Sequence, residues 1–378
     1  MDVRNGIDNI QEYDYLFMNK RIGLVTNITG LNKNYVSTID IVNKLYDLKI
    51  LFSPEHGLRG EYQAGDDIED YIDKVTNKAV ISLYGSKKSP TDEELKNIDI
   101  LIYDIQDLGI RYYTYIYTMY LCMEACSKNN IKFVILDRIN PLGGAFIEGN
   151  ILENKYSSFV GMLPIPNIYG LTIGELALYI NSSKNINCDL EIIKITGWKR
   201  GKKINETDLP WIPPSPNIPT LDSALVYGGT CLFEGTNVSE GRGTTKPFEI
   251  IGAPWIECNK LSNELNKIGE LGVYFRPVYF IPKFSKYKGE LCSGVQIHIK
   301  DYTKFSPVRI ALIILYKIKE LYPSKFKFHI NSKGFKYDFF KHLAGCDYIF
   351  KKSLRDIFEK YKQDENEFEK LIAKYRLY

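Results

Sequence analysis

The residues best suited to chemistry follow an apolar run at 49–52, in the segment SPEHG at 53–57. Glu55 and His56 stand there side by side, on a loop bounded by a proline and several glycines: Pro54, Gly57, Gly60 and Gly65. In an open α/β sheet, ligands bind beyond the carboxyl ends of the strands. A partly desolvated carboxyl group keeps its proton near neutral pH. We therefore predict that Glu55 transfers protons in an enzyme, and that His56 orients the substrate or tunes Glu55.

Two further apolar runs, 99–105 and 131–137, also lead into polar residues. The end of the first run and the residues after it provide Asp104, Gln106, Asp107 and Arg111, and the second run is followed in the same way by Asp137, Arg138 and Asn140. Because parallel strands end at the same edge of a sheet, these residues are predicted to converge with Glu55 on a polar ligand. Taken singly, each favours a structural role, such as a helix cap or an ion pair with Arg111 or Arg138. The set as a whole favours a ligand site.

A third group of candidates lies within the glycine-rich stretch 228–243 and shortly before it. Glu234, Asn237, Glu240 and Arg242 belong to the stretch itself, and Asn217 precedes it. A glycine-bracketed arginine, as in Gly241-Arg242-Gly243, suits a carboxylate because the planar guanidinium donates two parallel hydrogen bonds. The same spacing is equally compatible with a structural loop in which Arg242 binds a carbonyl oxygen or Glu240.

The elements that must position these residues alternate along the first half of the chain. Continuous apolar runs predict strands buried on both faces, at 21–27, 49–52, 79–84, 99–105, 131–137 and 190–195. Helical patterns fall between them, at 38–47, 91–96, 112–128 and 172–181, with Ser37, Thr91 and Thr172 as predicted N-caps. The alternation predicts an α/β fold with a doubly wound parallel sheet. The first turn, 26–30, lacks G-x-G-x-x-G, so no dinucleotide cofactor is predicted.

A proline-rich connector follows at 210–219, where neither a helix nor a central strand can persist. Beyond it, strands are predicted at 273–279 and 294–300, and helices at 306–322 and over most of 335–378. We place a boundary near Leu221, which gives a domain 1–221 carrying Glu55 and a smaller α+β domain 222–378 that closes the cleft.

Composition argues against several classes of function. Lys and Arg number 49 against 46 Asp and Glu, a formal charge of +3, which gives no electrostatic argument for a nucleic acid or an anionic membrane as partner. No run of eighteen apolar residues predicts a membrane span. Only four histidines occur, without an H-x-x-x-H pattern, so no metal site is predicted. The absence of G-x-S-x-G disfavours serine hydrolysis.

The cysteines bear on the compartment. There are seven, an odd number, and their spacing is scattered, which predicts free thiols in a reducing environment. The first ten residues, MDVRNGIDNI, contain no apolar segment of the kind found in signal peptides. Together these observations predict a cytoplasmic protein.

Several long motifs, in order, resemble the NamZ-type exo-β-N-acetylmuramidases: FSPEHGLRGEYQAG, YDIQDLGIRYYTYIYTM, LDRINPLGG, PSPNIPTLDSALVYGGTCLFEGTNVSEGRGTTKPFEIIGAPW and C-x-G-V-Q-I-H. The resemblance extends from about Gly6 to Tyr378. It implies a Rossmann-like N-terminal domain, a smaller C-terminal domain and an active site between them. It also implies release of N-acetylmuramic acid (MurNAc) from the non-reducing end of peptidoglycan fragments such as MurNAc-GlcNAc. The family's catalytic glutamate falls on Glu55. The chain departs from the family at Ile139, where the D-R-x-N-P motif often carries proline.

Glycoside hydrolysis needs an acid for the leaving oxygen and a base or nucleophile opposite. Glu55 is the predicted acid. Candidates for the second group are the substrate's own acetamide and four carboxylates, Asp104, Asp107, Glu234 and Glu240. MurNAc carries a lactyl carboxylate that N-acetylglucosamine lacks, and we hypothesise that Arg242 or Arg111 binds it. Two other readings stay open: a non-catalytic protein that binds muropeptides or acidic sugars, and a metal-assisted hydrolase or deacetylase using His56.

Overall fold

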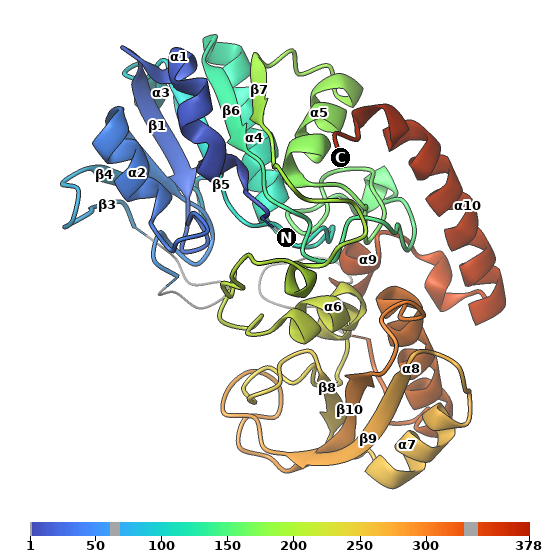
Figure 1. Ribbon diagram of the computed structural model, residues 1–378. Coiled ribbons are helices and arrows are strands. Elements are labelled where there is room, and N and C mark those ends of the chain that lie inside the picture. Colours follow the sequence, from blue (N-terminus) through green and yellow to red (C-terminus); the bar gives the residue numbers. More distant parts are fainter. Residues whose placement is uncertain (1, 61–68, 329–338) are drawn as a thin grey trace.

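Two lobes, each built around one sheet, make up the protein (Figure 1). The computed structural model describes residues 2–60, 69–328 and 339–378. The first lobe contains a seven-stranded sheet in the order β3-β4-β2-β1-β5-β6-β7, and the second a three-stranded sheet in the order β8-β10-β9. The predicted α/β fold with a mostly parallel sheet and a smaller second unit is confirmed. Gly65, one of the glycines assigned to the Glu55 loop, lies outside the described residues.

The first sheet contains all six strands that the apolar runs predicted, and these six run parallel: β1 Arg21–Thr26, β2 Asp47–Ser53, β4 Ala79–Ser82, β5 Ile100–Asp104, β6 Lys132–Leu136 and β7 Leu190–Ile193. All five residues of β5 are buried, as expected of a strand covered on both faces. A two-residue edge strand, β3 Tyr71–Ile72, pairs antiparallel with β4. It has too few residues to give a sequence signal.

Helices cover the two faces of this sheet: η1 Gly6–Tyr13, α1 Asp14–Phe17, α2 Thr38–Leu45, α3 Asp92–Leu95, α4 Tyr115–Asn129 and α5 Ile173–Ser183. The predicted caps Ser37, Thr91 and Thr172 accept hydrogen bonds from backbone N–H groups in the first turns of their helices. Helix α4 begins three residues later than predicted. Residues 112–114 therefore belong to the loop before the helix, where their side chains are available to a site. Two short 3-10 turns, Asn154–Tyr156 and Ile204–Glu206, complete this lobe.

The second lobe contains three α-helices, α6 Leu221–Thr230, α7 Cys258–Asn266 and α8 Pro307–Leu321, and a 3-10 turn after α6, η4 Cys231–Gly235. Its three strands are β8 Ile250–Ala253, β9 Val273–Phe280 and β10 Cys292–Ile299. The sheet is antiparallel. Helix α6 contains Gly228 and Gly229, which the sequence assigned to a glycine-rich loop. The reason is a close helix crossing, because a Cβ at Gly229 would lie 1.9 Å from the carbonyl oxygen of Pro307 in α8.

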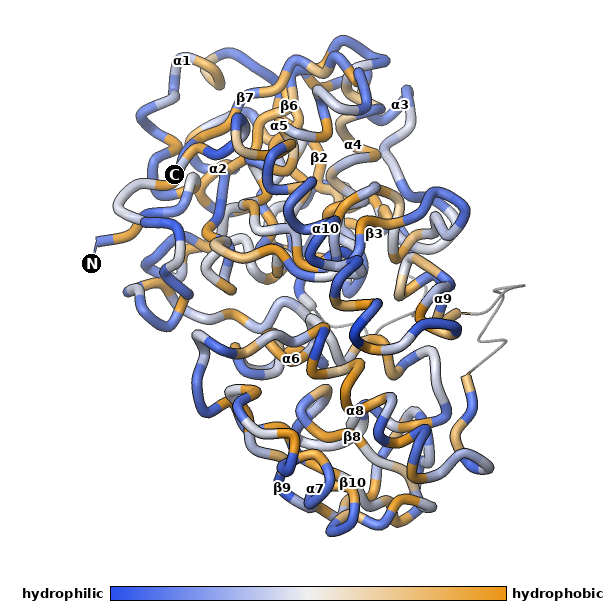
Figure 2. Tube along the Cα trace, turned by 90° about the vertical axis from the view of Figure 1, so that its right-hand side faces the viewer, coloured by the Kyte–Doolittle hydropathy of each residue, from blue (hydrophilic) through white to orange (hydrophobic). Residues whose placement is uncertain are grey.

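The chain then returns to the first lobe through α9 Phe339–Ala344, η5 Tyr348–Phe350, α10 Leu354–Ile372 and η6 Ala373–Tyr375. Helix α10, red in Figure 1, runs along one side of the molecule toward α5. Figure 2 shows it mostly hydrophilic, with the apolar segments gathered along the strands behind it. The Tyr378 hydroxyl donates to Asp137 Oδ2 over 2.7 Å and accepts from the Ile195 N–H. The last helix therefore fastens to the lobe that contains β6 and β7.

Two buried side chains of the first lobe also join the lobes. The Glu148 carboxylate accepts hydrogen bonds from the backbone N–H groups of Val308 and Arg309, at the start of α8. The Arg111 guanidinium donates to the carbonyl oxygens of Leu343 and Ala344 in α9. In both cases a buried ionisable side chain is hydrogen-bonded to backbone groups of the other segment, which compensates for the water it loses on burial.

Candidate active site

A pocket between the lobes contains Glu55. The first lobe contributes Glu55, His56 and residues 112–115, and the facing side contributes Ser215, Asn217, Ile218, Tyr227, Arg242 and Phe248. Four residues singled out from the sequence thus line one pocket: Glu55, His56, Asn217 and Arg242. Aromatic walls with a few polar groups are the usual lining of a site for a sugar or another small polar ligand.

The loop after β2 aims Glu55 through an unusual backbone turn. His56 has a φ of 73° and Gly57 a φ of 79°, and the Gly57 N–H donates to the Pro54 carbonyl oxygen over 3.1 Å. The left-handed region is uncommon for a residue with a side chain, and such strain concentrates at functional sites. His56 is buried beside the carboxyl group that the turn presents.

One oxygen of the Glu55 carboxyl group is held and the other is available. Oε2 accepts a hydrogen bond from the Thr114 hydroxyl over 2.8 Å. Among the described residues no hydrogen bond to Oε1 is formed, and the side chain is half-buried. A carboxyl group fixed by one oxygen and open at the other has the geometry that proton transfer to a bound ligand requires.

Arg242 supplies a cation on the opposite wall. Its guanidinium donates to Glu234 Oε1 over 2.8 Å, lies 3.6 Å from Glu240 Oε1, and stacks 4.9 Å from the Phe248 ring centre. Burial alone would lower the pKa of Arg242. The charges of Glu234 and Glu240 outweigh this effect, so the pKa of Arg242 lies above its ordinary value.

Glu234 and Glu240 therefore position Arg242 and do not line the pocket themselves. Glu240 is fully enclosed and also pairs with Lys286 Nζ at 2.9 Å. Burial acts to raise the pKa of Glu240, yet the charges of Lys286 and Arg242 hold it below its ordinary value. Both carboxylates contact a cation in the unliganded site, which speaks against the substrate contacts predicted for them.

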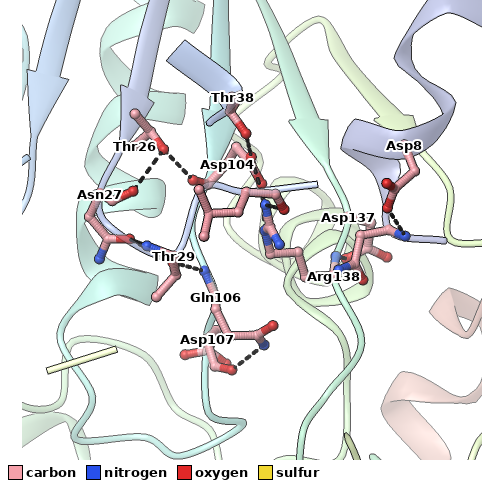
Figure 3. Close-up of polar contacts among 12 residues, drawn as sticks. Asp8, Thr26, Asn27, Thr29, Thr38, Asp104, Gln106, Asp107, Asp137 and Arg138 are labelled. Atoms are coloured by element: carbon pink, nitrogen blue, oxygen red, sulfur yellow. Dashed lines mark hydrogen bonds and ion pairs between the residues drawn. The ribbon is translucent and has the colours of Figure 1, made fainter. Parts of the chain in front are cut away.

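At the carboxyl edge of the sheet, several of the predicted ligand-binding residues contact one another (Figure 3). Asp104 is bound on both oxygens by the Arg138 guanidinium, at 2.6 and 2.8 Å, and also accepts from the Thr38 hydroxyl. Gln106 donates to the carbonyl oxygens of Asp107 and Ile139. Strand order reverses between β1 and β5, where such sheets usually bind ligands, and here this ion pair fills the position.

Asp137 is a structural residue as well. Its carboxylate accepts from the Thr172 hydroxyl, the Gly174 N–H and the Tyr378 hydroxyl. Burial raises the pKa of Asp137, like that of Asp107, to about 6. Asp104 and Asp137 thus have structural partners on both oxygens, which accounts for them without a substrate. Gln106 donates only through its Nε2 and lines a small pocket beside Arg138, so its substrate-binding role stays a prediction.

Arg111 and Asn237 lie away from the pocket. Arg111 is fully buried and donates to four carbonyl oxygens, of Asn150, Ile165, Leu343 and Ala344, over 2.6–3.1 Å. Burial lowers its pKa. The Asn237 amide binds the backbone of residues 325 and 327. The prediction that Arg111 contacts the substrate carboxylate is corrected by this geometry, which leaves Arg242 as the cation in the pocket.

Several lining residues were not singled out from the sequence, notably Tyr113, Thr114, Ser215, Tyr227 and Phe248. Tyr113 and Thr114 belong to the Tyr-Tyr-Thr triplet at 112–114, which the sequence analysis assigned to the helix 112–128 and therefore did not consider as part of a site. Within the described parts of the chain, no group of three or more His, Cys, Asp or Glu residues could hold a metal ion. None of the described helices combines the length and apolar character needed to cross a bilayer.

Comparison with known proteins places this geometry in a family. Residues 22–222 match the family model described as "Exo-beta-N-acetylmuramidase NamZ, N-terminal", and residues 225–378 match its C-terminal counterpart. The chain belongs to the NamZ exo-β-N-acetylmuramidase family. Over 384 aligned residues it is 47% identical to the peptidoglycan β-N-acetylmuramidase NamZ of Bacillus subtilis strain 168, covering all of this chain and 91% of that protein.

Two solved structures resemble this NamZ-family chain over its whole length. Both are DUF1343 family proteins from Bacteroides fragilis NCTC 9343. One is 38% identical with a TM-score of 0.91, and the other is 32% identical with a TM-score of 0.77. Each comparison covers 100% of this chain and 99% of the other. The fold of the two lobes is therefore shared with these two solved structures.

Proposed function

We propose that this protein is an exo-β-N-acetylmuramidase that releases MurNAc from the non-reducing end of peptidoglycan fragments. The observation that carries the proposal is the meeting of Glu55 and Arg242 in one interlobe pocket of a NamZ-family chain. An acid and a cation on facing walls match the two features of a muramide: a glycosidic oxygen that needs a proton, and a lactyl carboxylate that needs a positive charge.

In this mechanism Glu55 is the general acid. Thr114 fixes Oε2 of Glu55, so that Oε1 can meet the glycosidic oxygen and donate its proton as the bond to the anomeric carbon breaks. None of the four carboxylates considered for the opposite face, Asp104, Asp107, Glu234 and Glu240, lines the pocket. Among the groups considered, the acetamide of the substrate itself remains for that face.

Substrate choice follows from Arg242. The Phe248 ring and two carboxylates hold the guanidinium in place, so little side-chain entropy is lost when it binds an anion. A planar guanidinium can bind a carboxylate through two parallel hydrogen bonds. We propose that this interaction selects MurNAc-GlcNAc fragments over fragments that end in N-acetylglucosamine.

The deciding experiment is incubation of the protein with the β-linked disaccharide MurNAc-GlcNAc, followed by identification of the products by mass spectrometry. Free MurNAc and free GlcNAc are expected. The matched control is N,N′-diacetylchitobiose, which lacks only the lactyl ether and is expected to stay largely intact. Saturable binding of the disaccharide without release of MurNAc would instead identify a muropeptide-binding protein.

The cysteines support a proposed location. All seven are buried and unpaired, which is compatible with a reducing compartment, and we propose the cytoplasm. Cell fractionation followed by immunodetection tests this, and recovery of the protein with the secreted or wall-bound fraction would contradict it.

A further inference from the structure

Three tyrosines just before and at the start of α4 line the Glu55 pocket, and they differ in what their hydroxyl groups do. The Tyr112 hydroxyl donates to the Gly228 carbonyl oxygen, and the Tyr115 hydroxyl donates to that of Pro214 over 2.7 Å. The Tyr113 hydroxyl is buried, yet it forms no hydrogen bond within the described parts of the chain. Because buried polar groups are nearly always paired, this hydroxyl needs an explanation.

The Tyr113 ring is held rigidly, so the direction of its hydroxyl is set before any ligand arrives. Tyr115 packs against it at 4.8 Å between ring centres and 72° between planes, and Tyr227 packs at 6.1 Å and 80°. Tyr227 is in turn held by Phe248, 4.7 Å away. Side chains locked in this way are typical of groups that position a ligand.

The chemistry of the hydroxyl is that of a neutral donor. Burial raises the pKa of Tyr113 well above its ordinary value, so the phenol keeps its proton at every physiological pH. Ser215 and Tyr115 are the polar neighbours that act on its pKa, in opposite directions, but neither is close and aligned enough to satisfy the hydroxyl. The group can therefore satisfy itself by donating to an uncharged acceptor on a bound ligand.

We propose that the Tyr113 hydroxyl donates a hydrogen bond to the carbonyl oxygen of the 2-acetamido group of the sugar in this pocket, and so selects N-acetylated substrates. The inference rests on the proposed function. The acetamido carbonyl is a neutral acceptor on a MurNAc residue, and its methyl group suits the apolar surface that Tyr227, Phe248 and Ile218 provide. Arg242 serves the other distinctive substituent, the lactyl carboxylate, so the two groups read different parts of one sugar.

The test compares Tyr113→Phe with the wild type by calorimetric titration with MurNAc and with its 2-hydroxyl analogue, which keeps the 3-O-lactyl group. Binding is the readout because the acetamide is also the group proposed for the face opposite Glu55, so a 2-hydroxyl glycoside would lack it in catalysis. Tyr113→Phe should weaken binding of MurNAc about tenfold or more, because the removed donor served that carbonyl. Its affinity for the analogue should change by less than about threefold. An equal effect on both sugars, or no effect on either, would overturn the proposal.

A stability measurement separates this role from a structural one. Tyr113→Phe should keep or raise the unfolding temperature, because it removes a buried hydroxyl that has no partner in the protein. Tyr112→Phe is the matched control: it loses a hydrogen bond to Gly228 and should unfold at a lower temperature, while the ratio of its affinities for MurNAc and the 2-hydroxyl analogue stays that of the wild type. Destabilisation of Tyr113→Phe to the same extent as Tyr112→Phe would show that its hydroxyl has a protein partner, and would count against the proposal.

The inference can be tested even if the proposed function fails. Release of no MurNAc from the disaccharide by the wild type would refute the proposed function, but the calorimetric titrations with MurNAc and its 2-hydroxyl analogue would still decide the role of Tyr113. Tyr113→Phe should then weaken binding of MurNAc about tenfold or more and leave binding of the analogue unchanged. Equal affinities of the two proteins for MurNAc would refute the role of Tyr113 independently of catalysis.

Discussion

The Thr114 hydroxyl donates to Oε2 of Glu55 over 2.8 Å, joining the start of α4 to the loop that follows β2. Thr114 occupies the N-cap position of α4 but does not cap the helix with its side chain. Its hydroxyl instead donates a hydrogen bond to the carboxyl group of Glu55 in the pocket. The relationship shows how the proposed acid is held in place, and it gives the first two predictions.

Glu55→Gln should fold like the wild type and lose about 10²- to 10⁴-fold in kcat on the MurNAc-GlcNAc disaccharide, because the amide cannot give a proton to the leaving oxygen. A nitrophenyl muramide has a better leaving group and needs less acid assistance, so the loss on it should be smaller. The two substrates are compared in steady-state assays, with circular dichroism as the control for folding. Turnover of the disaccharide by the variant at the wild-type rate would remove Glu55 from the mechanism.

Thr114→Val keeps the shape of the side chain and removes the donor to Glu55. We expect kcat to fall about tenfold with little change in KM, because the carboxyl group loses its fixed orientation while the rest of the pocket stays in place. Thr114→Ser retains a hydroxyl and serves as the control, with activity near that of the wild type. Equal kinetics for Val and Ser at this position would show that the hydrogen bond does not matter for the reaction.

Arg242→Lys keeps the charge but replaces the planar guanidinium with a compact ammonium group. The preference for muramyl over glucosaminyl aryl glycosides should fall by about tenfold or more, because a lysine cannot bind a carboxylate through two parallel hydrogen bonds and contact Glu234 as well. The measurement is the ratio of kcat/KM for the two substrates. An unchanged ratio would mean that another group recognises the lactyl carboxylate.

Arg111→Met tests the corrected role of Arg111. The free energy of unfolding should fall by more than about 3 kcal/mol, because four buried carbonyl oxygens lose their donor. Urea denaturation measures the loss. The ratio between muramyl and glucosaminyl substrates, assayed at low temperature where the variant is folded, should be that of the wild type. A changed ratio would return Arg111 to the substrate site.

Glu148 should make stability depend on pH. Burial raises the pKa of Glu148 from an ordinary value of 4.5 to about 7, so the folded protein binds a proton that the unfolded chain releases between these values. The contribution of Glu148 to stability is therefore greatest below about pH 4.5, and it declines as the pH rises toward 7. Glu148→Gln removes this term. Its free energy of unfolding, relative to the wild type, should rise by about 3 kcal/mol between pH 4.5 and 8.

Urea titrations of the wild type and Glu148→Gln across this pH range provide the check. The other buried carboxyl groups with raised pKa values, Asp107 and Asp137, are present in both proteins, so their contributions cancel in the difference. A difference that stays constant with pH would show that Glu148 has the same pKa in the folded and the unfolded states.

The strands were predictable because each is a continuous apolar run, and the helix starts because Ser37, Thr91 and Thr172 are local signals. The roles of the polar residues at the sheet edge were not. Asp137 looks like a ligand-binding residue until its partner Tyr378 is known, and that partner lies 241 positions away. A carboxylate that is saturated by distant residues has the same sequence signature as one that waits for a substrate.

Within the pocket, Glu55 was a candidate because it follows an apolar strand on a glycine-bounded loop, whereas residue type and spacing left Arg242 and Arg111 as equal candidates for the carboxylate. Tyr113 and Thr114 could not be chosen in this way, because their role depends on α4 beginning at Tyr115 and not at residue 112. The ends of helices and strands are the least certain part of a prediction from hydrophobic periodicity. Here the three-residue error in the start of α4 assigned Tyr113 and Thr114 to a helix and not to the pocket wall.

The return of α10 to the first lobe constrains how the pocket can open. Within the described residues, the backbone crosses between the lobes before α6 and again between α9 and α10, and both tethers must keep their length in any motion. A swing of the second lobe is therefore confined to an axis that passes near both tethers. Sugar entry and exit are expected to follow a hinge rotation about that axis, together with side-chain movements at the rim.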